Sequence, residues 1–272
     1  MRVEFYDTTL RDGAQSEDIA FTLTDKLRIT EKLDEFGMHY IEGGWPGSNP
    51  KDLQYFKEVK KLGLKNAKIV AFSSTMKANT TPENDEIIKA LMNAHTEYIT
   101  IVGKSWDLHV KDALRVSMDT NLRMIERTIA YLKKSGKKVF FDAEHFFDGY
   151  KKNKAYATQV IETAYNAGAD AIVLCDTNGG SMPYEVYDIV GKVHSSIKRA
   201  LGIADMFRLY VLIGLRIPPY GAHMDTTLMG KSAFANIGPV FIGDKIGHFI
   251  NEKTQFAQFL ELFFLNPAVT HF

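Results

Sequence analysis

The chain has 272 residues, and its 33 Lys and Arg balance 33 Asp and Glu, so the formal net charge is zero. This balance argues against a nucleic-acid or membrane-surface role that depends on bulk charge. The single cysteine, Cys175, excludes an internal disulfide and suits a reducing compartment. The N-terminal residues lack the apolar core of a signal peptide, and no apolar run approaches the roughly 20 residues of a membrane span. We therefore expect a cytoplasmic protein that binds neither nucleic acid nor membrane.

Short apolar or β-branched runs alternate along the chain with amphipathic stretches. The predicted strands are Val3–Tyr6, His39–Glu42, Lys68–Phe72, Tyr98–Val102, Lys138–Asp142 and Ala171–Cys175. The predicted helices are Thr24–Phe36, Lys51–Leu62, Asn84–Ala94, Thr120–Ser135, Ala155–Ala167 and Pro183–Ala200. Strands that alternate with helices imply parallel pairing through crossover connections.

Six such units fit an α/β barrel of the TIM (β/α)8 type better than a doubly wound sheet, because the first turn is rich in Asp and lacks a glycine-rich phosphate fingerprint. Functional groups of such barrels gather at the C-terminal ends of the strands. The polar residues expected there are Asp7, Arg11, Asp12, Glu42, Ser73, Lys104, His109, Asp142, Glu144, His145, Asp176 and Thr177. Each of these residues alone could have a purely structural role, as a helix cap or an ion-pair partner. Their convergence on one face of the barrel predicts an active site for a small molecule.

Five longer strings carry a family resemblance. They are Tyr6–Gln15 (YDTTLRDGAQ), Tyr40–Asp52 (YIEGGWPGSNPKD), Gly103–Val110 (GKSWDLHV), Phe141–Gly149 (FDAEHFFDG) and Leu174–Gly180 (LCDTNGG). Through about residue 200, the chain resembles the citramalate synthase branch of the isopropylmalate, homocitrate and citramalate synthase family.

The resemblance implies a homodimeric TIM barrel with a divalent metal, Mg²⁺, Mn²⁺ or Zn²⁺. It also implies the condensation of acetyl-CoA with a 2-keto acid, here pyruvate, to give citramalate and CoA. By motif, the expected catalytic residues are Arg11 and Glu144, the expected metal ligand is Asp12, and the expected substrate contacts are Gln15, His109 and Thr177. A 2-keto acid chelates a hard cation, and an arginine would neutralise the alkoxide that forms at the new bond.

The second part of the chain departs from the family pattern. The sequence contains no His-x-His pair, which the family uses as metal ligands after strand seven, and no Gly-Glu-Arg-x-Gly-Asn string after strand eight. Resemblance resumes at Met229–Ala235 (MGKSAFA), but Asn236 follows where the family has a histidine. These departures indicate an internal deletion that covers the last two barrel units.

We therefore expect a barrel catalytic region over residues 1–200, and over 201–272 a divergent remainder that includes a remnant of the post-barrel segment. A barrel without strands seven and eight would leave open edges at strands one and six, and the apolar run Leu209–Leu215 is a candidate to fill one gap. His223 and Asp225 are candidate replacement metal ligands; the alternative is an exposed loop histidine. Two functional alternatives stay open, which are a catalytically inactive remnant and a synthase that uses another 2-keto acid.

Overall fold

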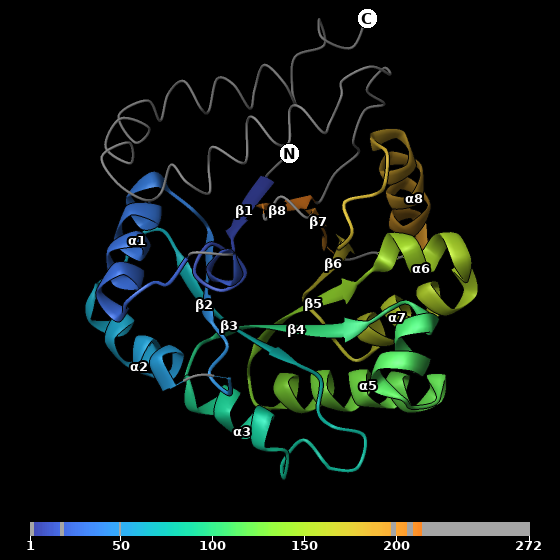
Figure 1. Ribbon diagram of the computed structural model, residues 1–272, viewed down its shortest axis with the longest axis horizontal. Coiled ribbons are helices and arrows are strands. Elements are labelled where there is room, and N and C mark those ends of the chain that lie inside the picture. Colours follow the sequence, from blue (N-terminus) through green and yellow to red (C-terminus); the bar gives the residue numbers. More distant parts are fainter. Residues whose placement is uncertain (1–2, 17–18, 49, 197–199, 206–208, 214–272) are drawn as a thin grey trace, which may run out of the picture.

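The computed structural model describes residues 3–16, 19–48, 50–196, 200–205 and 209–213, and within them eight strands close into a barrel in chain order (Figure 1). The strands are β1 (Val3–Asp7), β2 (Tyr40–Gly44), β3 (Lys68–Ser74), β4 (Tyr98–Lys104), β5 (Lys138–Glu144), β6 (Ala171–Asp176), β7 (Ala200–Asp205) and β8 (Leu209–Ile213). Neighbouring strands from β1 to β7 pair in parallel. The six predicted strands and their parallel pairing are therefore confirmed.

The longer helices lie outside the ring of strands (Figure 1). The longer ones are α1 (Leu23–Phe36), α2 (Pro50–Glu58), α3 (Glu86–Asn93), α5 (Met118–Lys134), α6 (Phe146–Lys152), α7 (Lys154–Asn166) and α8 (Pro183–Ser196). The short ones are η1 (Gly13–Gln15), η2 (Val59–Lys61), α4 (Asp107–His109) and η3 (Val110–Leu114). Local signals set their ends: in α1, Thr22 and Asp25 form a capping box, and Gly37 ends the helix in the left-handed conformation. No helix in the described part of the chain is long and apolar enough to cross a membrane.

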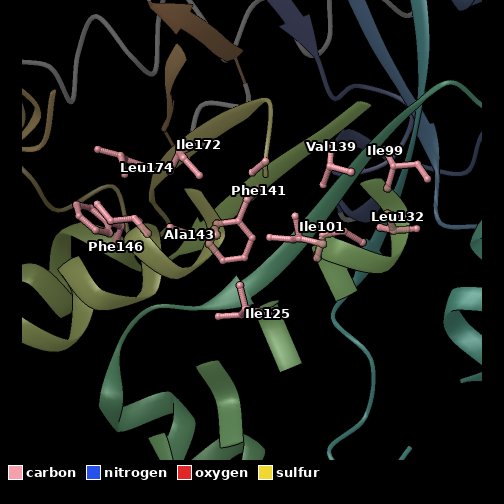
Figure 2. Close-up of a cluster of buried hydrophobic side chains, with 14 of the residues drawn as sticks. Ile99, Ile101, Ile125, Leu132, Val139, Phe141, Ala143, Phe146, Ile172 and Leu174 are labelled. Atoms are coloured by element: carbon pink, nitrogen blue, oxygen red, sulfur yellow. The ribbon is translucent and has the colours of Figure 1, made fainter. Parts of the chain in front are cut away.

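Alternate residues of each strand point into the barrel or out toward the helices. Outward residues of β4 and β5, such as Ile101 and Phe141, pack against Ile125 of α5 (Figure 2). Inward residues form a second apolar cluster, in which the rings of Tyr40 and Phe140 meet edge to face at 5.1 Å. The barrel interior is thus a packed core, and chemistry is left to its C-terminal rim.

The closure of the ring differs from the parallel family pattern. β7 continues the parallel order beside β6, but β8 runs antiparallel to both β7 and β1. Only residues 206–208 separate β7 from β8, and a parallel crossover needs about a dozen residues or more, so the chain returns as a hairpin. Strand seven is therefore present, and strand eight is replaced by an antiparallel strand.

The pairing of β6 and β1 corrects one expectation from sequence. The predicted open edges at strands one and six are wrong, because β7 covers β6 and β8 covers β1. Leu209–Ile213 fills the gap that the apolar run suggested, and the barrel strands continue past residue 200 to Ile213. A closed ring of this kind satisfies backbone groups that an open sheet edge would expose.

Candidate active site

The turn after β1 carries the first group of site residues. The backbone N–H groups of Arg11, Asp12 and Gly13 all donate to the carbonyl oxygen of Thr8, at 3.1, 2.9 and 3.0 Å. Thr8 is fully buried, so this turn is anchored at the C-terminal rim of the barrel. The tight turn lets the side chain of Arg11 reach across to the end of the neighbouring strand β2.

The Arg11 guanidinium contacts Glu42, Asp12 and Phe72. Its Nε donates to Oε1 of Glu42 at 2.5 Å, and its Nη1 lies 3.3 Å from Oδ1 of Asp12. Its Cζ lies 3.8 Å from the ring centroid of Phe72, which is a cation–π arrangement. The Arg11 side chain is only 12% exposed. The cation is therefore fixed in direction and largely removed from water, which strengthens its field at the rim.

Glu42 anchors this arginine from inside the barrel. Its carboxylate is completely buried and also accepts a hydrogen bond from the Tyr6 hydroxyl at 2.5 Å, while that hydroxyl lies 2.6 Å from Oγ1 of Thr100. Burial raises the pKa of Glu42, and the charge of Arg11 opposes this rise. Burial and the Glu42 charge raise the pKa of Tyr6 far above its usual value, so Tyr6 stays a protonated donor.

Sequence reasoning named Glu42 among the strand-end residues but left it out of the site. The signal that identifies it is the period of two along β2, which places Tyr40 and Glu42 on the same, inward face. A carboxylate on that face needs a buried cation as its partner, and Arg11 is the cation within reach.

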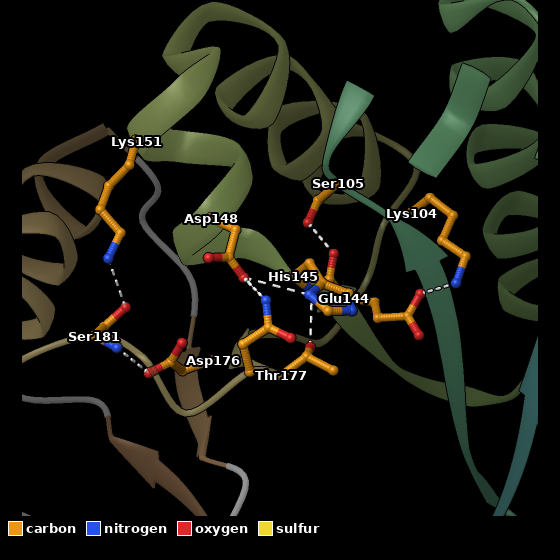
Figure 3. A network of polar contacts seen from close by, with 10 residues as sticks. Lys104, Ser105, Glu144, His145, Asp148, Lys151, Asp176, Thr177 and Ser181 are labelled. Atoms are coloured by element: carbon orange, nitrogen blue, oxygen red, sulfur yellow. Dashed lines mark hydrogen bonds and ion pairs between the residues drawn. The ribbon is translucent and has the colours of Figure 1, made fainter. Parts of the chain in front are cut away.

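Glu144 lies at the end of β5 in the second group of site residues (Figure 3). It pairs in register with Lys104 at the end of β4, and the two side chains form an ion pair with each about a quarter exposed. The Glu144 carbonyl oxygen accepts from Oγ of Ser105 at 2.6 Å, and the Lys104 carbonyl oxygen accepts from Nδ2 of buried Asn121 at 2.8 Å. Both main chains are thus tied down, so the ion pair has a rigid base.

Thr177 and His145 connect the rims of β5 and β6. Oγ1 of Thr177 accepts from the backbone N–H of His145 at 2.9 Å, and Nδ1 of His145 lies 3.3 Å from Oδ2 of Asp148 (Figure 3). His145 has φ of 55°, a left-handed conformation that is uncommon for residues other than glycine. This turn directs the imidazole along the rim, toward the loop that follows β4.

His109 stacks on that imidazole. The two ring centroids are 4.4 Å apart in an edge-to-face arrangement, and the Trp106 ring lies 4.9 Å from His109. Burial, and then the neighbouring charges of His145 and Lys104, lower the pKa of His109. His109 is therefore a neutral imidazole near pH 7.

The two groups of site residues lie at the same end of the barrel. Arg11 and Asp12 follow β1, His109 follows β4, Glu144 ends β5 and Thr177 follows β6. Thus the structure brings Arg11 and Asp12 together directly, and Glu144, His109 and Thr177 lie elsewhere on the same rim. Gln15 ends η1 and is exposed, and its side chain forms no hydrogen bond with a described residue, so its contact with substrate stays a prediction. His223 and Asp225 lie outside the described residues.

The expected metal ligand has little support around it. Among the described residues, no group of three or more His, Cys, Asp or Glu side chains is placed to hold a metal ion. Asp12 supplies one carboxylate, and Arg11 contacts it. Divalent metals are held by several ligands at once, so the described residues do not fit a metal centre.

Comparisons with known proteins agree with the barrel fold. The HMGL-like family model matches residues 2–206. The chain is 55% identical over 201 residues to the (R)-citramalate synthase of Geobacter sulfurreducens and 55% identical over 199 residues to that of Aquifex aeolicus. These matches cover 74% and 73% of this chain but only 38% of each relative. The chain therefore spans well under half the length of these relatives.

Solved structures show the same fold at low sequence identity. The hydroxymethylglutaryl-CoA lyase of Pseudomonas aeruginosa superposes with a TM-score of 0.60 at 16% identity, covering 74% of this chain and 68% of that one. At that identity, the likeness supports the barrel fold and no particular chemistry.

Proposed function

Because the chain belongs to the HMGL-like family, we propose that it is an acyltransferase of the citramalate synthase type, which condenses acetyl-CoA with pyruvate. In this reaction the acetyl methyl group loses a proton, and its carbon attacks the keto carbon of pyruvate. The new alkoxide takes up a proton, and water cleaves the thioester to give citramalate and CoA. The observation that carries the proposal is the fixed Arg11 guanidinium on the rim that also bears Glu144.

Arg11 is suited to the oxygen of the keto acid. Negative charge develops on that oxygen as the carbon–carbon bond forms, and a preorganised cation stabilises it without having to reorient. Glu42 and Phe72 fix the guanidinium before substrate arrives. The Arg11 guanidinium is therefore assigned to the keto oxygen of pyruvate.

Thr177 and His109 are assigned to substrate binding, and Glu144 to positioning on the same rim. The Thr177 hydroxyl accepts from His145, and a hydroxyl that accepts one bond still has a proton to donate, here to the pyruvate carboxylate. Neutral His109 offers an N–H without adding charge. Lys104 keeps the Glu144 carboxylate oriented beside them.

No step of the proposal runs through a metal, because the described residues do not fit a metal centre. The divalent metal, with Asp12 as a ligand, stays a prediction that the family suggests. Its test is the rate after chelation with EDTA and after return of Mg²⁺, Mn²⁺ or Zn²⁺, in the unmodified chain and in Asp12→Asn.

The proposed activity is tested by release of the CoA thiol from acetyl-CoA, followed with a thiol-reactive dye. We expect release that requires pyruvate and that falls on the order of 100-fold or more in Arg11→Ala, because a transition-state donor is lost. Arg28→Ala, which removes an exposed arginine on α1, is the matched control and should keep the full rate. A rate that survives Arg11→Ala contradicts the assignment.

The alternatives give different outcomes in the same assay. Faster CoA release with 2-ketoisovalerate or 2-ketoglutarate than with pyruvate would assign another acceptor to the same residues. Pyruvate binding by calorimetry without any CoA release would identify a non-catalytic remnant. The homodimer that the family suggests is tested by light scattering on the eluting protein, with twice the 30.7 kDa chain mass as the expected result.

A further inference from the structure

A pocket of about 370 Å³ lies at the end of the barrel opposite the candidate active site. It is formed by η2 and the segment before β3 on one side, and by the turn before β4 on the other. The strand residues that line it, Lys68, Ile69 and Tyr98, lie at the start of β3 and β4, whereas the active-site residues lie at or after the ends of their strands. Its volume is at the lower end of the range for small-molecule clefts.

The floor of the pocket is apolar. Phe56 and Val59 are almost completely buried beneath it, and Ile69 of β3 packs against the same core. These side chains would bury a few carbon atoms of a ligand, which is the main source of favourable free energy in such a cleft.

The rim of the pocket is cationic. Lys60 and Lys68 line it and are exposed, and neither ammonium group forms an ion pair with a described residue. Behind the rim, Nζ of Lys137 donates to the carbonyl oxygen of Thr96 at 2.6 Å. Burial, and then the charge of Lys60, lower the pKa of Lys137, so the two ammonium groups repel one another. One carboxylate among the lining residues, Glu97, offsets this charge only in part.

Thr96 gives a second, independent indication of a ligand. Thr96 is among the residues that line the pocket and is 8% exposed, and its Oγ1, which is buried, has no hydrogen-bond partner among the described residues. Buried hydroxyl groups are nearly always hydrogen-bonded in folded proteins. A hydroxyl can donate to an anionic oxygen at the same time as a lysine does.

We propose that this pocket binds a small organic anion, with an apolar body against Phe56 and Val59 and a carboxylate or phosphate group between Lys60 and Lys68. The ligand would neutralise cations that form no ion pair with a described residue, and it would offer an acceptor to the Thr96 hydroxyl after a rotation about χ1 turns that buried group toward the pocket. This site is separate from the rim that carries Arg11, so a failure of the proposed catalysis would not affect this proposal.

The test is an amide NMR titration of the full chain with hexanoate and, in a second arm, with hexyl phosphate. We expect saturable shifts at residues 59–69 and 95–98. The 1-hexanol control lacks the charge, and acetate lacks the apolar body; both should bind much more weakly. The arm with the tighter binding identifies the preferred head group.

Charge-removing variants complete the test. Lys60→Met together with Lys68→Met should weaken binding about five- to tenfold, because each partly exposed charge pair contributes well under a tenfold factor of its own. Lys89→Met, which removes an exposed lysine of α3, should leave binding unchanged. Both lysines are exposed, so the double variant should fold, and its amide spectrum will confirm it. Shifts spread over the whole surface, equal binding of hexanol, or unchanged affinity in the double variant would overturn the proposal.

Discussion

Replacement of Glu42 by Gln tests the idea that a buried carboxylate fixes the arginine of the site. The substitution keeps the shape of the side chain and an oxygen acceptor, but it removes the negative charge that lies 2.5 Å from Nε of Arg11. With the amide oxygen toward Arg11, the Tyr6 hydroxyl can accept from the amide NH2 and donate to Oγ1 of Thr100. The expected loss of stability is therefore dominated by the uncompensated cation.

The magnitude follows from the burial of the pair. Removal of one partner of a buried ion pair costs about 3–5 kcal/mol of unfolding free energy. Three features of the site reduce this cost. Gln still accepts a hydrogen bond, the Arg11 side chain is 12% exposed and gains some hydration, and burial of a neutral amide is less costly than burial of the Glu42 carboxylate. We expect Glu42→Gln to lower the unfolding free energy by about 2 kcal/mol.

The assay is urea unfolding followed by circular dichroism, with Glu58→Gln as the matched control. Glu58 pairs with Lys61 on the surface, and such pairs contribute below about 1 kcal/mol. A double-mutant cycle with Arg11→Met should give a coupling of at least about 1 kcal/mol between Arg11 and Glu42. A loss no greater than that of Glu58→Gln, or an additive cycle, would refute the reasoning.

Three further changes have defined outcomes. Burial raises the pKa of Asp7 to about 6, above its value of about 3.9 in an unfolded chain. Between these two values the folded state binds the Asp7 proton more tightly, so the contribution of Asp7 to stability falls as pH rises from 4 to 6. The stability of Asp7→Asn relative to wild type should accordingly rise by about 2 kcal/mol between pH 4 and pH 7 in urea titrations, and a constant difference would contradict this. Gly149→Ala would place a Cβ 2.6 Å from the carbonyl oxygen of Ser105, so its unfolding free energy should fall by about 1–2 kcal/mol and its thermal midpoint should fall with it. Gly191→Ala, with open space around the new Cβ, should raise the unfolding free energy by up to about 1 kcal/mol. Equal effects of the two substitutions would count against the Gly149 contact. The carboxylate of Asp85 caps α3 and accepts from four donors, so Asp85→Ala should lower the unfolding free energy by about 3 kcal/mol in urea titrations. Asp85→Asn should recover much of this loss. A loss under about 1 kcal/mol in Asp85→Ala would contradict the capping account.

Local pattern was enough to predict the six parallel strands and the rim that bears the site. A period of two, glycine stops and polar strand ends are local signals, and they placed Arg11, Asp12, Glu144 and Thr177 at the correct ends of their strands. The antiparallel β8 was harder to predict. Its direction follows from the three residues that separate it from β7, which are too few for a parallel crossover. Its position follows from the edge of β1, with which it also pairs.

Partnerships across the barrel could not be predicted in the same way. The bond of Arg11 to Glu42 joins residues 31 positions apart, and that of Lys104 to Glu144 joins residues 40 positions apart. Both depend on strand register, which sequence pattern leaves open until neighbouring strands are paired. The left-handed conformation of His145 is similar, because it is imposed by the surrounding turn and by the Thr177 contact.

The most direct test of the account is the conversion of pyruvate labelled with ¹³C at its keto carbon, followed by carbon NMR in the presence of acetyl-CoA. The account predicts that the keto signal is replaced by that of the quaternary carbon of citramalate, and that the rate falls on the order of 100-fold in Arg11→Ala. A keto signal that persists with the wild-type chain, or conversion that Arg11→Ala leaves unchanged, would contradict it.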